Sequence, residues 1–262
     1  MKIPTAKLLS AVSLCAVLYA AGSAARADVT ISYNNTVIAI NGRTANPDGF
    51  WNSALDTGLN LQLSLRAQTT EFLIPSSPND GAGTFFFPVG YSIYSGVKAK
   101  WGDWFSINTD YTGLGGNKLT AFDFYLTYDT PAAPGTFRTP FNVLTDFTDN
   151  SYGDNATANH AGIVGTPSTS AGLQATYNIA QNAENIGFEG LTPNLVGNYD
   201  YQLYAVAAGA GANGTRLLEA DMIVQVQATP EPTTLALAGL GLMAMLALPP
   251  TRRSIKLARQ RK

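Results

Sequence analysis

The sequence predicts an all-β domain, an antiparallel β-sandwich or a jelly-roll-like fold. An apolar segment without this strand pattern lies at each end of the chain. Apolar and polar residues alternate in many short stretches, as in strands that bury one face. Gly, Pro, Asn and Asp gather between these stretches, where turns need them. No stretch between the two ends has a convincing helical period. Many short strands joined by turns favour a sandwich or a jelly roll.

The alternation defines the individual strands. It is clearest where Leu59, Leu61, Leu63 and Leu65 are separated by polar residues. The predicted strands are 29–33, 37–40, 59–66, 85–89, 104–108, 122–128, 173–179, 199–205 and 218–226. Residues 151–170 have the weakest pattern, and we expect a long loop there. A boundary between two smaller domains near residues 140–170 is the alternative.

The N-terminal end has the three parts of a removable signal peptide. Two lysines in the first seven residues precede an apolar run over 8–18, and small residues follow. Ala25 and Ala27 form a small-x-small cleavage site directly before Asp28. The apolar run is shorter than the about 20 residues that a stable membrane span needs. We therefore expect residues 1–27 to be removed during export.

Cys15 is the only cysteine of the chain, and it lies inside this predicted signal peptide. A lipoprotein site would need a small residue before the cysteine, and Leu14 stands there. Ordinary cleavage after Ala27 is therefore favoured. The mature protein would then contain no disulfide, no cysteine-based zinc site and no thiol nucleophile.

The C-terminal end is a short apolar segment between prolines, followed by a basic tail. Pro230-Glu231-Pro232 comes first, an apolar stretch follows over 235–248, and Pro249-Pro250 ends it. The 16 residues of 233–248 would form a helix of about 24 Å, which is thinner than a bilayer core of about 30 Å. The tail holds six basic residues, which the positive-inside rule keeps in the cytoplasm: Arg252, Arg253, Lys256, Arg259, Arg261 and Lys262.

These last 33 residues resemble a PEP-CTERM sorting signal, which combines Pro-Glu-Pro, a short Gly- and Leu-rich span and an Arg-rich end. The tail from Ser254 onward is longer and more mixed than is usual in that family. The resemblance implies that exosortase, a membrane-embedded cysteine protease-transpeptidase of Gram-negative bacteria, cuts near Pro230, Glu231 and Pro232. It also implies an association with exopolysaccharide and biofilm formation. A plain single-pass anchor is the alternative.

The domain organisation follows from these two ends: 1–27 is the signal peptide, 28–229 the β-sandwich ectodomain and 230–262 the sorting signal. The ectodomain has seven Lys and Arg against 17 Asp and Glu, a net charge of −10. Such an acidic domain is not expected to bind nucleic acid or anionic lipid through charge. Before processing, the chain is expected to contact the inner membrane through its C-terminal helix.

Aromatic residues offer one candidate binding site. Trp101-Gly102-Asp103-Trp104-Phe105 is the densest aromatic cluster of the chain. Flat aromatic faces bind sugar rings, so Trp101 and Trp104 are candidates for carbohydrate binding if they lie on an exposed face. Packing in the core is the alternative, because large aromatic side chains usually lie there.

Acidic residues offer two weaker candidates. An oxygen-rich loop could hold calcium, although its spacing does not match an EF-hand, and it consists of Asp146, Asp149, Asn150, Asp154 and Asn155. Glu184 and Glu189 could form the carboxylate pair of a glycoside hydrolase. We prefer the interpretation without function, in which the loop is a solvated turn and the two glutamates are surface residues. No metal and no cofactor are therefore expected.

As to function, the sequence predicts a non-catalytic protein of the cell surface or extracellular matrix. It would be anchored transiently in the inner membrane of a Gram-negative bacterium, with exosortase as its processing partner and exopolysaccharide as a candidate matrix partner. The ectodomain has no recognisable nucleophile motif and one histidine, His160. A carbohydrate-binding module is the first alternative, and a β-sandwich glycoside hydrolase is the second.

Overall fold

The computed structural model describes five stretches of the chain: 29–41, 49–70, 79–92, 98–185 and 195–228. The predicted signal peptide with Ala27 and Asp28, the Pro230-Glu231-Pro232 motif, the C-terminal helix and Glu189 lie outside them. The chain divides into two compact units, Met1–Gln227 and Ala228–Lys262. The described helices are too short or too polar to cross a membrane.

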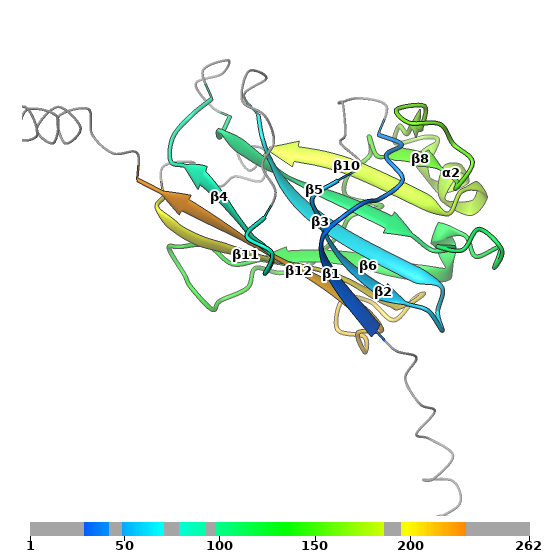
Figure 1. Cartoon of the computed structure of the whole chain (residues 1–262). Helices are drawn as coiled ribbons and strands as arrows, with labels where there is room; N and C mark the ends of the chain where they lie inside the picture. The colour runs from blue at the N-terminus through cyan, green and yellow to red at the C-terminus, as the bar shows by residue number, and fades with distance from the viewer. Residues whose placement is uncertain (1–28, 42–48, 71–78, 93–97, 186–194, 229–262) are drawn as a thin grey trace, which may run out of the picture. The chain divides into compact units, whose positions relative to one another are not determined.

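The first sheet has seven strands in the order β1-β2-β3-β5-β10-β8-β9, and all of its pairings are antiparallel (Figure 1). Its long central strands β3 and β5 run side by side from end to end. The strands span Val29–Asn35 (β1), Trp51–Asp56 (β2), Leu61–Thr69 (β3), Trp101–Asn108 (β5), Ser151–Gly153 (β8), Ile163–Val164 (β9) and Ile179–Asn185 (β10).

The second sheet has five strands in the order β4-β12-β11-β6-β7. The strands span Thr84–Pro88 (β4), Phe122–Tyr128 (β6), Phe141–Asn142 (β7), Gly197–Ala207 (β11) and Leu218–Gln227 (β12). Strand β4 pairs parallel to β12. The prediction of a purely antiparallel fold is therefore wrong at this one pair, because β4 reaches its neighbour by a crossover from the first sheet instead of a hairpin.

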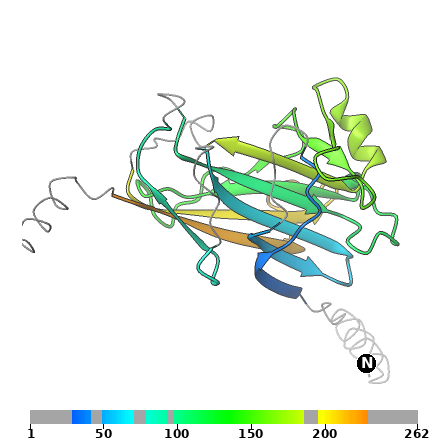
Figure 2. The same cartoon turned by 45° about the horizontal axis from the view of Figure 1, so that its top comes forward.

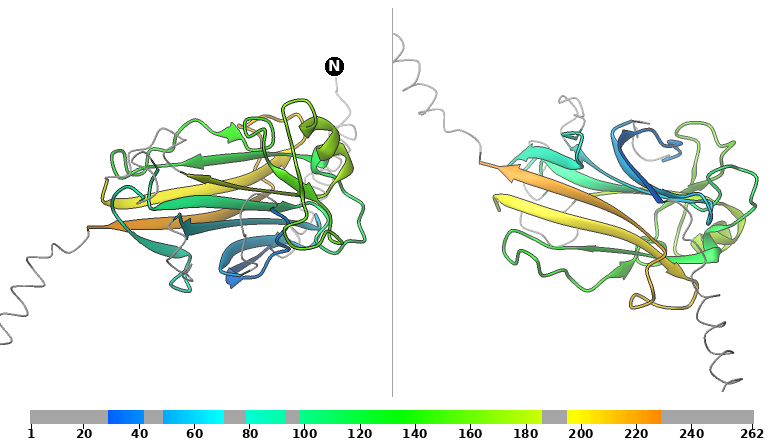
Figure 3. Two further views of the ribbon diagram at one scale, coloured as in Figure 1. Left: turned by 90° about the horizontal axis from the view of Figure 1, so that it is seen from above. Right: turned by 60° about the horizontal axis from the view of Figure 1, so that its bottom comes forward.

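The two sheets pack face to face around one apolar core, which is the arrangement of a β-sandwich (Figures 2 and 3). The core draws on both sheets, and Trp101 of β5 meets Tyr199 of β11 edge-on, with ring centroids 5.2 Å apart. All pairings of the described strands and this core lie within Val29–Gln227. This part of the chain therefore has its own core, as an independently folding domain needs.

The predicted strands at 29–33, 59–66, 85–89, 104–108, 122–128, 199–205 and 218–226 are confirmed within a few residues at their ends. Residues 151–170, expected as a loop, contain the two short strands β8 and β9. The second-domain alternative near this segment finds no support, since β8 pairs with β10 in the first sheet.

The predicted strand at 173–179 is wrong over most of its length. Ser170–Thr176 forms the short helix α2, and β10 begins only at Ile179. Leu173 and Tyr177 both pack against the core. These two residues are four apart, so the same apolar pair that fits an alternating strand also fits one face of a helix.

The predicted strand at 37–40 is also wrong, although the segment is buried. It lies beside the first sheet without joining its ladder. The Gln181 side-chain oxygen accepts hydrogen bonds from the N–H groups of Ile40 at 2.8 Å and Asn41 at 3.1 Å. Its nitrogen donates to the carbonyl of Ile38 and to the Ser106 hydroxyl. The Gln181 amide, together with the N–H groups of His160 and Gly162 that donate to the carbonyls of Ala39 and Ile40, satisfies this backbone in place of a strand partner.

Candidate functional site

The end of β12 is the part of the described structure nearest in sequence to the predicted sorting site. β12 is hydrogen-bonded to β11 on one side and to β4 on the other (Figure 3). Its last residue, Gln227, is opposite Pro88, and the Val89 N–H donates to the Gln227 carbonyl at 2.8 Å. Only Ala228 and Thr229 separate this fixed strand end from Pro230 in the sequence.

The two tryptophans of the predicted sugar-binding cluster are buried. Trp101 is 1% exposed and Trp104 is 7% exposed, so neither offers a flat face to solvent. They also lie on opposite faces of β5, as residues three apart in a strand must. Trp101 packs in the core between the sheets, whereas Trp104 packs with Val37 and Trp51 on the outer face of the first sheet. Of the two interpretations of this cluster, packing in the interior is the one that agrees with the structure.

Gly102, between these tryptophans, has a packing role. A Cβ atom at this position would collide with the backbone carbonyl of Glu184 on the paired strand β10, where Gly102 itself lies opposite Asn185. Only glycine lets the two backbones approach this closely. The cluster that looks like a binding motif in the sequence is therefore explained by the requirements of the sheet.

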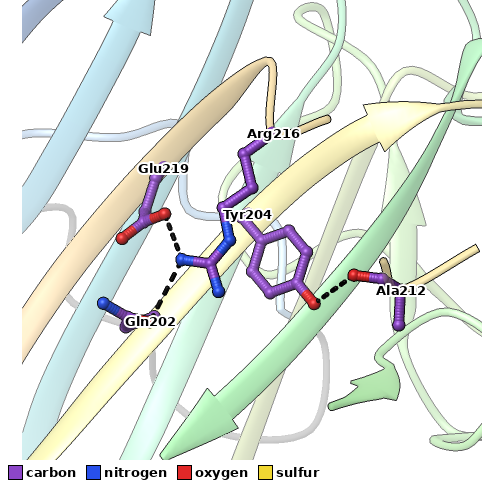
Figure 4. Close-up of polar contacts among 5 residues, drawn as sticks. All are labelled: Gln202, Tyr204, Ala212, Arg216 and Glu219. Atoms are coloured by element: carbon purple, nitrogen blue, oxygen red, sulfur yellow. Dashed lines mark hydrogen bonds and ion pairs between the residues drawn. The ribbon is translucent and has the colours of Figure 1, made fainter. Parts of the chain in front are cut away.

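The outer face of the second sheet carries a different polar and aromatic cluster, shown in Figure 4. The Arg216 guanidinium lies over the Tyr204 ring, 4.1 Å from its centroid, and donates to the Gln202 side-chain oxygen at 3.1 Å and to Glu219. The Tyr204 hydroxyl donates to the Ala212 carbonyl at 2.9 Å. Burial raises the pKa of Tyr204. These contacts tie the hairpin between β11 and β12 to its own strands.

Asp221 lies two residues beyond Glu219 on β12. Partial burial raises the pKa of Asp221 to about 6, and the Glu219 carboxylate adds to the effect. Asp221 also lines a small cleft of about 90 Å³ with Ile31, Tyr33, Asn52, Ser53 and Ala220. The Asn52 side chain donates to the Asp221 backbone carbonyl at 3.0 Å and so joins β2 to β12 here.

A larger cleft of about 270 Å³ opens beside β6 and β7, and it is lined by Thr127, Tyr128, Arg138, Thr139 and Phe141. Arg138 is exposed and lies over the Tyr128 ring, 5.4 Å from its centroid. Its guanidinium donates to the Tyr128 hydroxyl at 2.6 Å. This cleft therefore combines a cation, hydroxyl groups and the half-buried Phe141 ring. No pattern in the sequence singles out Arg138, because its partner lies ten residues away across a turn.

The oxygen-rich loop does not converge on one point. Asn150 donates to the backbone carbonyls of Val143 and Phe147. Asp154 instead accepts from Ala156 and Thr157, two and three residues further along the chain. Among the described residues there is no group of three or more His, Cys, Asp or Glu side chains suited to a metal ion. These side chains stabilise the backbone of the loop and its turns through hydrogen bonds.

The candidate carboxylate pair cannot be assembled from the described residues. Glu184 is half-buried on β10, where its carboxylate accepts a hydrogen bond from the Asn182 side chain at 3.3 Å. Glu189 lies outside the described residues. Two other acidic residues, Asp129 and Asp200, lie opposite each other where β6 ends beside β11. The Asp200 N–H donates to the Asp129 carboxylate at 3.1 Å. Burial, and then the Asp129 charge, raise the pKa of Asp200.

In a comparison with protein families, residues 228–253 match the PEP-CTERM protein-sorting motif. Comparisons with curated proteins and with solved structures give no match. The matched segment starts at Ala228, the first residue after β12, and contains Pro230, Glu231 and Pro232. PEP-CTERM proteins are exported and sorted at the cell envelope, and the motif implies processing by exosortase. The chain is therefore an exported protein that carries a PEP-CTERM sorting motif directly behind its last strand.

Proposed function

We propose that this chain is a non-catalytic protein of the cell surface or extracellular matrix, which exosortase releases from a transient inner-membrane anchor. The proposal rests on the position of the PEP-CTERM motif in the chain. It begins at Ala228, directly after a strand that is held by neighbours on both sides. A cut near Pro230-Glu231-Pro232 removes no strand of the sandwich and no member of its core.

The nature of the domain supports a structural role. Its three tryptophans are all buried, since Trp51 is 0%, Trp101 1% and Trp104 7% exposed. Its net charge of −10 favours solubility outside the cell. Exopolysaccharide is the matrix partner that the sorting motif suggests.

The experiment separates the structural role from catalysis. The purified domain, residues 28–229, is incubated with the exopolysaccharide of its host, and new reducing ends are measured. We expect none. New reducing ends that disappear in Glu184→Gln or Glu189→Gln would replace this proposal with a glycoside hydrolase, which needs only two carboxyl groups.

Carbohydrate binding is the second candidate function, and the cleft beside β6 and β7 is the observation that favours it. Arg138 gives a cation suited to a sugar carboxylate, and Phe141 gives an aromatic surface for a sugar ring. Binding to an acidic polysaccharide, measured by calorimetry, should then weaken in Arg138→Ala. The matched control is Arg216→Ala, which removes an equally charged, exposed side chain outside the cleft.

A further inference from the structure

Among the strands that the structure describes, four lie at the edges of the two sheets, and one of these four differs from the other three. β7 and β9 have two residues each, and β4 has five residues and ends in Pro88. Short edge strands and proline are the usual protections against pairing with another chain. β1, which no other described strand covers at its outer edge, has seven residues, neither proline nor any charged side chain, and a β-bulge-type irregularity only beyond Ser32 (Figure 1).

β1 also contributes little to the core of its own domain. None of its seven residues is buried, whereas five of the six residues of β2 beside it are. Val29, Ile31 and Tyr33 are 45%, 51% and 44% exposed, and the alternation of a strand puts them on one side. Ile31 and Tyr33 line the cleft of about 90 Å³ next to β12, so the space under them is not filled by the core.

We propose that β1 is the contact strand of a homodimer, in which two copies pair antiparallel through this edge and join their seven-stranded sheets. The sequence of β1 is self-complementary in this arrangement. With Ile31 opposite Ile31 of the second copy, Val29 lies opposite Tyr33, and Thr30 lies opposite Ser32. The apolar residues of both copies then share one side of the new ladder.

The charge of the domain favours a second copy at this edge. Two domains of net charge −10 repel each other over most of their surface. An uncharged strand is where they can meet without placing like charges directly opposite one another. The irregular pairing between Ser32 and Asn35 limits the regular ladder with β2 to the first half of β1. The new contact is therefore short and centred on Ile31.

The expected affinity is modest. A single strand pair buries less than the about 1,200 Å² or more of a stable interface. We therefore expect a dissociation constant in the micromolar to millimolar range, at which a crowded surface layer would still drive pairing. Because long-range electrostatic repulsion between the two acidic domains opposes the dimer, added salt should lower its dissociation constant.

The first test is the molecular mass of residues 28–229 by analytical ultracentrifugation, over concentrations up to about 1 mM, which matches the weakest expected affinity. We expect a monomer–dimer equilibrium that Ile31→Lys weakens at least tenfold, while the melting temperature stays the same. The matched control is Ile163→Lys, at the opposite edge of the same sheet, where Ile163 is 48% exposed. A monomer at all concentrations would overturn the proposal, as would equal effects of both substitutions.

The second test fixes the register. The mature protein has no cysteine, so a single introduced thiol reports one contact. Opposite residues of an antiparallel pair come within the distance that a disulfide spans. Under mild oxidation Ile31→Cys should form a covalent dimer, and Ile163→Cys should not. A dimer in solution without cross-linking at Ile31 would place the interface elsewhere and contradict the proposal.

Discussion

The N–H of Val89 donates a hydrogen bond to the carbonyl of Gln227 at 2.8 Å. This bond holds the final residue of β12, and the sorting motif starts at the next position. The folded domain therefore ends where the processed segment begins, with three residues between Gln227 and Glu231. Under the proposed function the cut falls near Pro230-Glu231-Pro232, directly behind this strand in the sequence, so no described strand would have to unfold for it.

The mature N-terminus is expected at Asp28. Ala25 and Ala27 fill the small-residue positions of the cleavage site, and β1 begins at Val29, so the cut leaves the first strand whole. N-terminal sequencing of the exported protein checks this. Ala27→Glu should slow removal of the signal peptide, whereas Ala24→Glu should not, because position 24 is outside the small-x-small pair. An intact Met1 on the mature surface protein would exclude the prediction.

Gln181→Met should destabilise the domain strongly. Methionine nearly keeps the volume but removes the side-chain oxygen that accepts hydrogen bonds from the buried N–H groups of Ile40 and Asn41. Each lost partner costs about 1–3 kcal/mol, so we expect a loss of roughly 3 kcal/mol in the free energy of unfolding in urea. Gln202→Met is the control, because Gln202 is only partly buried on the outer face. A loss below about 0.5 kcal/mol, typical of surface changes, would show that water replaces the amide.

Asp221→Asn should stabilise the domain at neutral pH. The folded-state pKa of about 6 lies above the unfolded value of 3.8, so the folded protein prefers the protonated carboxyl. Stability from this group is lost as the pH rises from about 4 to 6. The free energy of unfolding of the asparagine variant should therefore be higher by on the order of 1 kcal/mol at pH 8 and unchanged near pH 3.5. The figure is reduced because solvent screens the part of the Asp221 side chain that is exposed.

Asp80→Asn provides a control of opposite sign. Hydrogen bonds from the backbone N–H groups of Thr84 and Ala82 lower the pKa of Asp80. The ionised form is thus favoured in the folded state, and its contribution is lost as the pH falls through the folded pKa. The variant should have a lower melting temperature at pH 8 than the wild type, and the difference should shrink in acid. Parallel pH profiles for the two variants would contradict both assignments.

Sequence patterns predicted β6, β11 and β12 of the second sheet, because apolar residues recur at every second position of their sequences. The two-residue strand β7 has no such pattern and was not predicted. β12 has buried and half-buried or exposed residues in strict turn. The first sheet is different: every residue of β5 is buried. Alternation then no longer tells which residues face solvent, and a segment far away in the sequence, residues 37–41, covers the outer face through Gln181.

The candidate sites show the same limit. A sequence window shows Trp101 and Trp104 as one cluster, but a strand sends residues three apart to opposite faces. The cleft of about 90 Å³ is formed by strands that lie far apart in the sequence, β1 and β2 with β12, so no window of the sequence could show it. The sorting motif, in contrast, is read as a linear stretch of chain, so its residues could be identified from order and composition alone.

Processing by exosortase is the central claim, and the C-terminus of the exported protein tests it most directly. Mass spectrometry of the surface or matrix fraction should find a terminus near Pro230-Glu231-Pro232 and no peptide from Ser254 to Lys262. Glu231→Ala and deletion of the exosortase gene should each restore that peptide, whereas Glu219→Ala should not. Recovery of the 254–262 peptide at full stoichiometry from wild-type cells would show a permanent anchor and contradict the account.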